Sequence, residues 1–278
     1  MEVVKIGSWE EFESRLQELR RIRAEYVRQD EDSYIPQLLF RGQARASWHL
    51  QTTFERYVPQ IDKWIDYFRI STAVQHEMES LTGKRWHLPD FSKMSEWTEK
   101  SKWPWLRELP GYDYLLHLRH HGFPSPLLDW SRSPYVAAFF AFRTAASEDV
   151  AIFAFLEQTG QGKSALGGTP TIHTQGPFVT THARHVLQQC EYSICTSFID
   201  DNLLIADHED VFARDDKHQD VLWKLVLPAK LRFEILQRLD RFNLNAFSLF
   251  QSEEALLETL ALRQIIFSGR FGLAPDQD

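Results

Sequence analysis

The sequence predicts an α+β fold in which a mainly antiparallel sheet is surrounded by helices. The run "DVAIFAFLE" at 149–157 is apolar throughout and has the length of a buried strand. Two further runs, "EYSICTSFI" at 191–199 and "VLWKLVLP" at 221–228, are rich in β-branched and aromatic residues. Stretches with helical spacing lie between the strands at irregular intervals, which differs from the regular alternation of parallel α/β proteins.

The first strand and helix are expected at the N-terminus. The β-branched residues at 3–6 predict a short strand, and Ser8 with Glu11 three residues later has the spacing of a capping box. A second strand is expected at Leu38–Phe40, ended by a break at Gly42, with another extended piece at Trp48–Leu50.

The middle of the chain is expected to be largely helical. Trp64–Arg85 has a helical pattern, and an aromatic and polar connection follows at 86–106. The apolar spacing at 111–121 predicts a helix that Gly122 ends. Pro134 suits the first turn of an Ala- and Phe-rich helix that is buried on most sides.

The last third of the chain is expected to combine a loop, strands and helices. Thr159–Pro177 is rich in Gly, Thr and Ser and predicts a loop or lid. Helical patterns are expected at 229–243 and 252–266, the second with Ser252 as its cap.

Composition limits the classes of function. The chain has 278 residues, 43% of them hydrophobic, so it is long enough to bury a large core. Its net charge of −8 argues against a general electrostatic hold on nucleic acid. Cys190 and Cys195 are too close in sequence for a useful disulfide loop. The first 16 residues contain neither a signal-peptide pattern nor a membrane span, so we expect a cytoplasmic protein that does not enter a membrane.

Four segments resemble the FRG domain, a family named for an aromatic-Arg-Gly motif that is Phe40-Arg41-Gly42 here. The segments occur in the family's order: "LLFRGQARASWHLQTTFERY", "LLHLRHHGFPSPLLDWSRSPYVAAFFAF", "ARHVLQQCEYSI" and "LNAFSLFQSEEALLETL". The resemblance covers about residues 36–260 and predicts one FRG-type domain over 1–278. The chain departs from the family where Ser125-Pro126 replaces Thr-Arg and where Cys190 replaces glycine.

The FRG pattern is in turn similar, more distantly, to that of ADP-ribosyltransferases. This similarity implies a split sheet of the ADP-ribosyltransferase type, NAD as substrate and an unidentified macromolecular acceptor. It also implies a role as a bacterial toxin or phage-defence effector. Arg41, Ser131 and either Gln189 or Glu191 occupy the places of that family's site residues. A non-catalytic module that binds a nucleotide or partner remains the alternative, and a nuclease or other hydrolase has less support because no acidic cluster for magnesium is visible.

Arg41 and Gly42 are the first candidate residues. A guanidinium group binds phosphate with two hydrogen bonds, and glycine lets a ligand approach the backbone, so the pair suits the pyrophosphate of NAD. The alternative is an Arg–carboxylate pair that holds a turn. Arg184 is a further candidate for cofactor binding.

The stretch from His120 to Ser131 holds the next candidates. His120 and His121 follow a helix and could bond its last carbonyls or reach a ligand, and no zinc-like partner spacing accompanies them, so no metal is expected. Asp129 could cap backbone N–H groups, orient His121 or act in catalysis. Ser131 is favoured as a helix cap, and Trp130 could stack on a ring of the cofactor or be a buried anchor.

Gln189 and Glu191 complete the catalytic candidates. If both lie on a strand, their alternation places both side chains on one face, where they could contact the nicotinamide ribose and the acceptor. Glu191 could instead be a solvated strand residue. Cys190 has no evident basic activator and is not expected to be a nucleophile.

Overall fold

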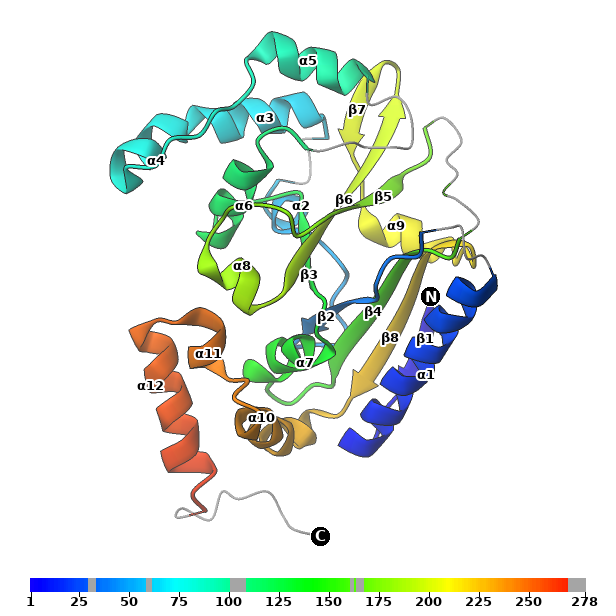
Figure 1. Cartoon of the computed structure of the whole chain (residues 1–278), viewed down its shortest axis with the longest axis vertical. Helices are drawn as coiled ribbons and strands as arrows, with labels where there is room; N and C mark the ends of the chain where they lie inside the picture. Colours follow the sequence, from blue (N-terminus) through cyan, green and yellow to red (C-terminus); the bar gives the residue numbers. More distant parts are fainter. Residues whose placement is uncertain (30–33, 59–61, 101–108, 161–162, 164–167, 270–278) are drawn as a thin grey trace.

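The computed structural model describes residues 1–29, 34–58, 62–100, 109–160, 163 and 168–269. Its centre is a mixed, mostly antiparallel sheet of eight strands, which confirms the predicted α+β class (Figure 1). The strand order is β1-β8-β4-β2-β3-β6-β5, and β7 pairs with β6 outside this path. The strands are β1 (Glu2–Lys5), β2 (Leu39–Gln43), β3 (Leu128–Ser131), β4 (Val150–Gln158), β5 (Thr171–Gln175), β6 (Cys190–Ile199), β7 (Asn202–Ile205) and β8 (Gln219–Leu227).

Helices surround this sheet (Figure 1). In the described ranges they are α1 (Trp9–Gln29), α2 (Thr53–Tyr57), α3 (Trp64–Ala73), α4 (Gln75–Thr82), α5 (Phe91–Lys100), α6 (Tyr112–His120), α7 (Pro134–Arg143), α8 (Ala183–Leu187), α9 (His208–Ala213), α10 (Arg232–Arg241), α11 (Ala246–Phe250) and α12 (Glu253–Ala261). A 3-10 turn at Ala229–Leu231 precedes α10, and a π-helical turn at Leu262–Ile266 follows α12. None of the helices in the described parts of the chain is long and apolar enough to cross a bilayer.

Apolar packing forms two large regions that helices cover, besides a third cluster that includes Trp130 and Phe155. Helices α1, α7 and α10 pack on one face of β4, β8 and β2, where Phe12, Phe142 and Ile152 are fully buried. Helices α3, α5 and α6 form a second core with β6, which includes Trp64 and Tyr192. The β2–β3 pair lies where the strands of these two regions meet in the sheet.

The predicted helix caps form. Ser8 Oγ accepts a hydrogen bond from Glu11 N at 3.2 Å, and the Glu11 carboxylate accepts one from Gly7 N at 2.6 Å. Ser252 Oγ accepts from Ala255 N at 3.3 Å at the start of α12. The two serine bonds satisfy N–H groups that the first helical turn leaves without partners, whereas Glu11 bonds Gly7 N and not the Ser8 N of a capping box.

The predicted strand break at Gly42 is wrong. Strand β2 continues through Gly42, which pairs with Ile152, to Gln43, which pairs with Ala151. A Cβ at Gly42 would lie 1.9 Å from the carbonyl oxygen of Ala137 in α7. The glycine is therefore required because α7 crosses directly against the strand. The extended piece expected at Trp48–Leu50 does not pair as a strand.

Three other expectations about secondary structure are also corrected. The helix expected at Trp64–Arg85 is two helices, because the backbone at Val74 (φ −95°, ψ 2°) leaves the helical region. The connection expected at 86–106 contains α5, which its buried Met94 anchors, while 101–106 lies outside the described residues. The expected loop Thr159–Pro177 contains β5, which the backbone pairing with β6 stabilises despite its polar composition.

Candidate functional site

The candidate site lies where β2 and β3 separate. These two strands pair only through Phe40 and Ser131, whereas β2 pairs with β4 over five positions. Arg41 follows Phe40 on β2, and Asp129 lies two residues before Ser131 on β3. Both side chains therefore border the opening between the strands.

Two arginines share the Asp129 carboxylate. Arg41 Nη1 donates to the backbone oxygen of Asp129 at 2.8 Å and to its Oδ1. Arg119, from the last turn of α6, donates through Nη2 to the same Oδ1 and through Nη1 to Thr53 Oγ1 at 3.2 Å. The two arginine side chains are only 14% and 12% exposed, so the chain has buried two guanidinium groups around one carboxylate.

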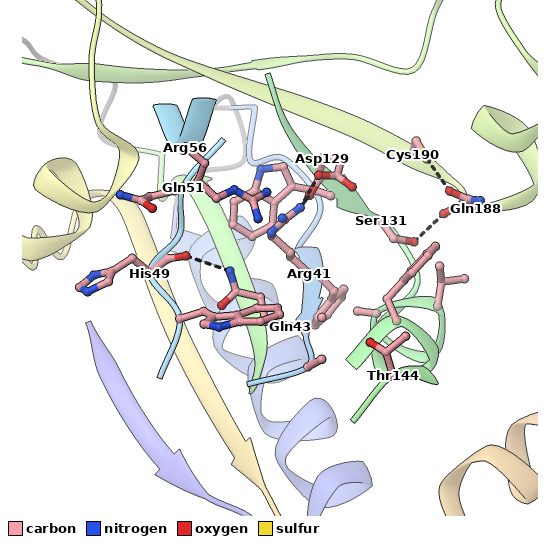
Figure 2. A pocket seen from close by; sticks show the side chains of 18 of the residues that line it. Arg41, Gln43, His49, Gln51, Arg56, Asp129, Ser131, Thr144, Gln188 and Cys190 are labelled. Carbon is pink, nitrogen blue, oxygen red and sulfur yellow. Dashed lines mark hydrogen bonds and ion pairs between the residues drawn. The ribbon is translucent and has the colours of Figure 1, made fainter. Parts of the chain in front are cut away.

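Arg56 adds a third guanidinium group. It comes from α2, and Figure 2 shows it directed toward Arg41. Burial lowers the pKa of Arg56, and the positive charges of Arg41 and Arg119 lower it further. The neighbouring Glu55 has its pKa raised to about 7 by burial, so it carries only part of a negative charge at neutral pH.

The Asp129 carboxyl is held in its charged form. Burial raises its pKa, but the guanidinium groups of Arg119 and Arg41 outweigh that effect and hold the pKa well below its usual range. A carboxylate whose pKa is held this far below neutral accepts a proton poorly, so Asp129 is a weak general base. With three arginines and one full negative charge, the cluster has excess positive charge and is suited to an anionic ligand.

Arg41, Arg56 and Asp129 of this cluster line a cavity of about 430 Å³, a size common for small-molecule sites, whereas Arg119 does not line it (Figure 2). The cavity is lined by Phe40, Arg41, Gly42, Gln43, Ala44, Ser47, Trp48, His49, Gln51, Arg56, Asp129, Trp130, Ser131, Val136, Ala137, Phe140, Thr144, Gln188 and Cys190. Of the predicted residues, it brings together Arg41, Gly42, Asp129, Trp130 and Ser131.

Ser131 and Trp130 are held by bonds within the protein. The prediction that Ser131 caps the helix is wrong, because Ser133 is the N-cap of α7 and accepts from Val136 N. Ser131 Oγ instead donates to the backbone oxygen of Gln188 at 2.7 Å and accepts from Ser133 N at 3.0 Å. The indole N–H of Trp130 donates to Ser193 Oγ at 2.8 Å, and its ring stacks on Phe155 with centroids 5.0 Å apart. Trp130 is 2% exposed, which favours the buried-anchor interpretation.

The two predicted histidines do not line the cavity. His120 Nε2 lies 2.9 Å from the hydroxyl of Tyr192. Burial, reinforced by Arg119, lowers its pKa to about 4. The His121 ring contacts the rings of His117 and His182, and it lines a separate apolar cavity of about 630 Å³. The described residues contain no group of three or more His, Cys, Asp or Glu placed to hold a metal ion.

The predicted pair of Gln189 and Glu191 is not a pair on one strand. Gln189 has φ of 50° and lies in the turn before β6, so strand alternation does not relate the two side chains. Glu191 is on β6, 3.8 Å from Arg132 Nε, and burial raises its pKa. Arg184 lies over the ring of Phe250 at 5.4 Å. None of the three lines the cavity.

Gln188 and Cys190, the neighbours of Gln189, line the cavity instead. Gln188 Nε2 donates to the backbone oxygen of Leu249 at 3.1 Å, which fixes its amide. Cys190 and Cys195 are free thiols, both buried. Burial raises the pKa of the Cys190 thiol to about 12, so it is protonated and unsuited to nucleophilic attack.

The sequence interpretation missed Gln43, Trp48, Arg56 and Arg119. Gln43 could have been found, because strand alternation places it on the same face as Arg41. Arg119 and Arg56 gave no comparable signal, because they reach the site from helices α6 and α2, whose packing against the sheet was not predicted.

The comparisons with known proteins agree with the motif. Residues 36–150 match the FRG domain family. The chain carries an FRG domain. No curated protein and no solved structure matches the chain. The matched FRG segment supplies Arg41, Arg56, Arg119 and Asp129, so the whole charged cluster comes from this part of the chain. The wider domain limits, 36–260 and 1–278, stay predictions.

Proposed function

We propose that this FRG-domain protein binds NAD through its pyrophosphate at Arg41 and Arg56, with Arg119 holding Asp129 in place, and uses it in an ADP-ribosyltransferase-like reaction. The observation that carries the proposal is that Arg41, Arg56 and Asp129 line a cavity of ligand size, while Arg119 bonds the same Asp129 carboxylate without lining the cavity. The opening between β2 and β3 also suits the split sheet of an ADP-ribosyltransferase-like fold.

The guanidinium groups are already positioned to bind a diphosphate. Arg41 and Arg119 are already held before a ligand arrives, by hydrogen bonds to the Asp129 side chain, to the Asp129 backbone oxygen and to Thr53, which reduces the ordering needed on binding. Arg41 Nε is buried without a hydrogen-bond partner among the described residues, so a phosphate oxygen that displaced part of the wall would supply one. Burial of the cluster strengthens each of these charge-assisted hydrogen bonds.

In the proposed reaction the bond between nicotinamide and ribose C1′ breaks, and its electron pair leaves with nicotinamide. An acceptor nucleophile then donates an electron pair to C1′ and releases its proton to solvent. The transition state carries positive charge on the ribose ring. Asp129, the only carboxylate among the described lining residues, would stabilise that charge electrostatically without taking up a proton.

A non-catalytic nucleotide-binding module is the second candidate function. Its supporting observation is that Glu191 lies away from the cavity and that Asp129 is already bonded to two arginines. A site of this kind holds a phosphorylated ligand without a second carboxylate to activate an acceptor. This candidate predicts that the nucleotide is recovered unchanged.

The test is release of nicotinamide from NAD by the purified chain, with and without a cell lysate as source of acceptor. We expect release, and we expect Arg41→Ala and Asp129→Ala to reduce it at least 100-fold while both variants keep a cooperative unfolding transition. Arg69→Ala is the control, because Arg69 is 59% exposed in a surface pair with Asp66.

Absence of release under every condition would reject the enzyme, and unchanged NAD recovered from a bound complex would support the binding module. Loss of cooperative folding in Arg41→Ala or Asp129→Ala would show that the residue is structural. Expression in bacteria adds a separate measurement, because a toxin or defence effector of this type should slow growth only with Arg41 and Asp129 intact.

A further inference from the structure

The Gln43 amide has a fixed orientation and an unused acceptor. Its Nε2 donates to the backbone oxygen of His49 at 3.1 Å. Because a backbone carbonyl only accepts, the nitrogen must face His49 and Oε1 takes the other side of the amide (Figure 2). Gln43 is 7% exposed, and Oε1 has no hydrogen-bond partner among the described residues. A buried acceptor of this kind is stabilised by any ligand that brings a donor.

Gln43 and Arg41 belong to the same wall of the cavity. They are alternate residues of β2, so their side chains leave the strand on one face. Both line the cavity, and Arg41 is part of the proposed phosphate site. A ligand held by its phosphates at Arg41 therefore extends the rest of its structure within reach of the next position on that face.

Trp48 supplies an aromatic surface to the same cavity. It is 46% exposed, and the Arg45 guanidinium lies 5.5 Å from the centroid of its ring. Trp48 belongs to the irregular segment between β2 and α2, so its side chain can shift more easily than one on the sheet. Movement of Trp48 is needed because Gln43 Oε1 is covered, so a ligand donor must displace part of the cavity wall to reach it.

We propose that Gln43 and Trp48 form a ring subsite, in which Gln43 Oε1 accepts a hydrogen bond from an amino group attached to a planar ring that packs on Trp48. The inference rests on the proposed nucleotide site but not on its catalysis. Two parts of NAD have this chemistry: the 6-amino group of adenine and the carboxamide of nicotinamide. In place of that amino group, hypoxanthine presents its O6 carbonyl and nicotinic acid a carboxylate, so neither can donate to Gln43 Oε1 from that position.

The experiment is calorimetric titration of the full chain with pairs of ligands that differ in this one group. ADP against IDP tests adenine, and NAD against nicotinic acid adenine dinucleotide tests the carboxamide. We expect one of the two pairs to show about fivefold to tenfold stronger binding of the amino-bearing ligand, as for loss of one hydrogen bond to a buried acceptor. The pair that discriminates identifies the ring in the subsite.

Variants test whether Gln43 is the cause. Gln43→Met removes the acceptor at similar side-chain volume and should abolish the discrimination, so that the two members of the pair bind equally. Gln51→Met is the matched control, because Gln51 lines the same cavity and should leave the discrimination intact. The comparison of ligands on the unmodified protein remains decisive even if Gln43→Met does not fold.

The outcomes separate this inference from the proposed function. Equal binding of both members of each pair would overturn the ring subsite while leaving a nucleotide site in place. Discrimination without nicotinamide release would uphold the subsite and reject the enzyme. Failure of every nucleotide to bind would overturn both.

Discussion

Two charged clusters lie along the same sheet and differ in charge balance and in access. At the β2–β3 opening, three guanidinium groups surround the Asp129 carboxylate beside a cavity. Between β4, β5 and β8, Lys163 Nζ lies 2.7 Å from Asp220 Oδ1 and 3.2 Å from Glu157 Oε1. The Lys163 and Asp220 side chains are each 2% exposed, and this second cluster lines neither of the cavities described above.

The difference separates a binding role from a structural one. Among the described residues, the Lys163 cluster has at least as many acidic groups as basic ones, and it lines neither cavity. Lys163 is paired with both carboxylates, although Asp220 Oδ2 has no hydrogen-bond partner among the described residues, so the cluster contributes to stability or to strand register. The Asp129 cluster has unbalanced positive charge that faces open space. Charged groups with shifted pKa values indicate a functional site when a ligand can reach them.

The largest expected effect is on the Lys163 cluster. Lys163→Met leaves Glu157 and Asp220 buried without their cation, and we expect the free energy of unfolding to fall by about 3–5 kcal/mol. Chemical denaturation followed by tryptophan fluorescence measures this change. Lys217→Met is the control, because Lys217 pairs with Asp215 at the surface and should change stability by less than about 1 kcal/mol. Equal effects of the two substitutions would remove the distinction between the clusters.

The second prediction concerns pH. Burial raises the pKa of Asp220 from 3.8 to about 6, although Lys163 opposes the shift. The folded state therefore binds the Asp220 proton more tightly than the unfolded state does. Protonated Asp220 therefore stabilises the folded protein by about 2–3 kcal/mol below about pH 4. This stabilisation is lost as the pH rises through 6. Asp220→Asn removes this titration, and asparagine tolerates the backbone φ of 53° at this position.

The comparison to make is the difference in unfolding free energy between the unmodified chain and Asp220→Asn at several pH values. The free energy of unfolding of the unmodified chain should fall relative to that of Asp220→Asn as the pH rises from 4 to 6.5. Histidines and other acids titrate in both proteins and cancel in the difference. A constant difference across this range would mean that the folded protein keeps an ordinary pKa at Asp220.

The sequence predicted the strands and helices that local pattern determines. The runs that became β4, β6 and β8, the capped helix α1 and the Pro134 helix α7 were all expected, because apolar periodicity and capping residues act over a few positions. Strand β5 was missed because its residues are polar and its stability comes from pairing with β6. Local composition carries no information about such a partner.

The candidate site was predictable only in part for the same reason. Arg41 and Asp129 came from the motif and from the polar stretch before α7, and the structure places them in contact. Arg56 and Arg119 could not be assigned, because their positions depend on how α2 and α6 pack against β3. Gly42 was expected to admit a ligand, but its missing side chain makes room for α7.

The smallest expected effect distinguishes two proposed roles of Asp129, which are to hold the arginines in place and to stabilise the positive charge on the ribose. Asp129→Asn keeps the shape of the side chain and removes its negative charge. If the arginines are held sufficiently by their other contacts, ADP should bind up to about tenfold more tightly at low salt, or about 1.4 kcal/mol, because a repulsive charge has gone. Nicotinamide release should still fall at least 100-fold, because the charge that stabilises the ribose cation is lost. Asp66→Asn, in the surface pair with Arg69, is the control. Weaker ADP binding by a folded Asp129→Asn would instead show that the charge of Asp129 is needed to hold Arg41 and Arg119 in place. The carboxylate would then act in ligand binding and not in the chemical step.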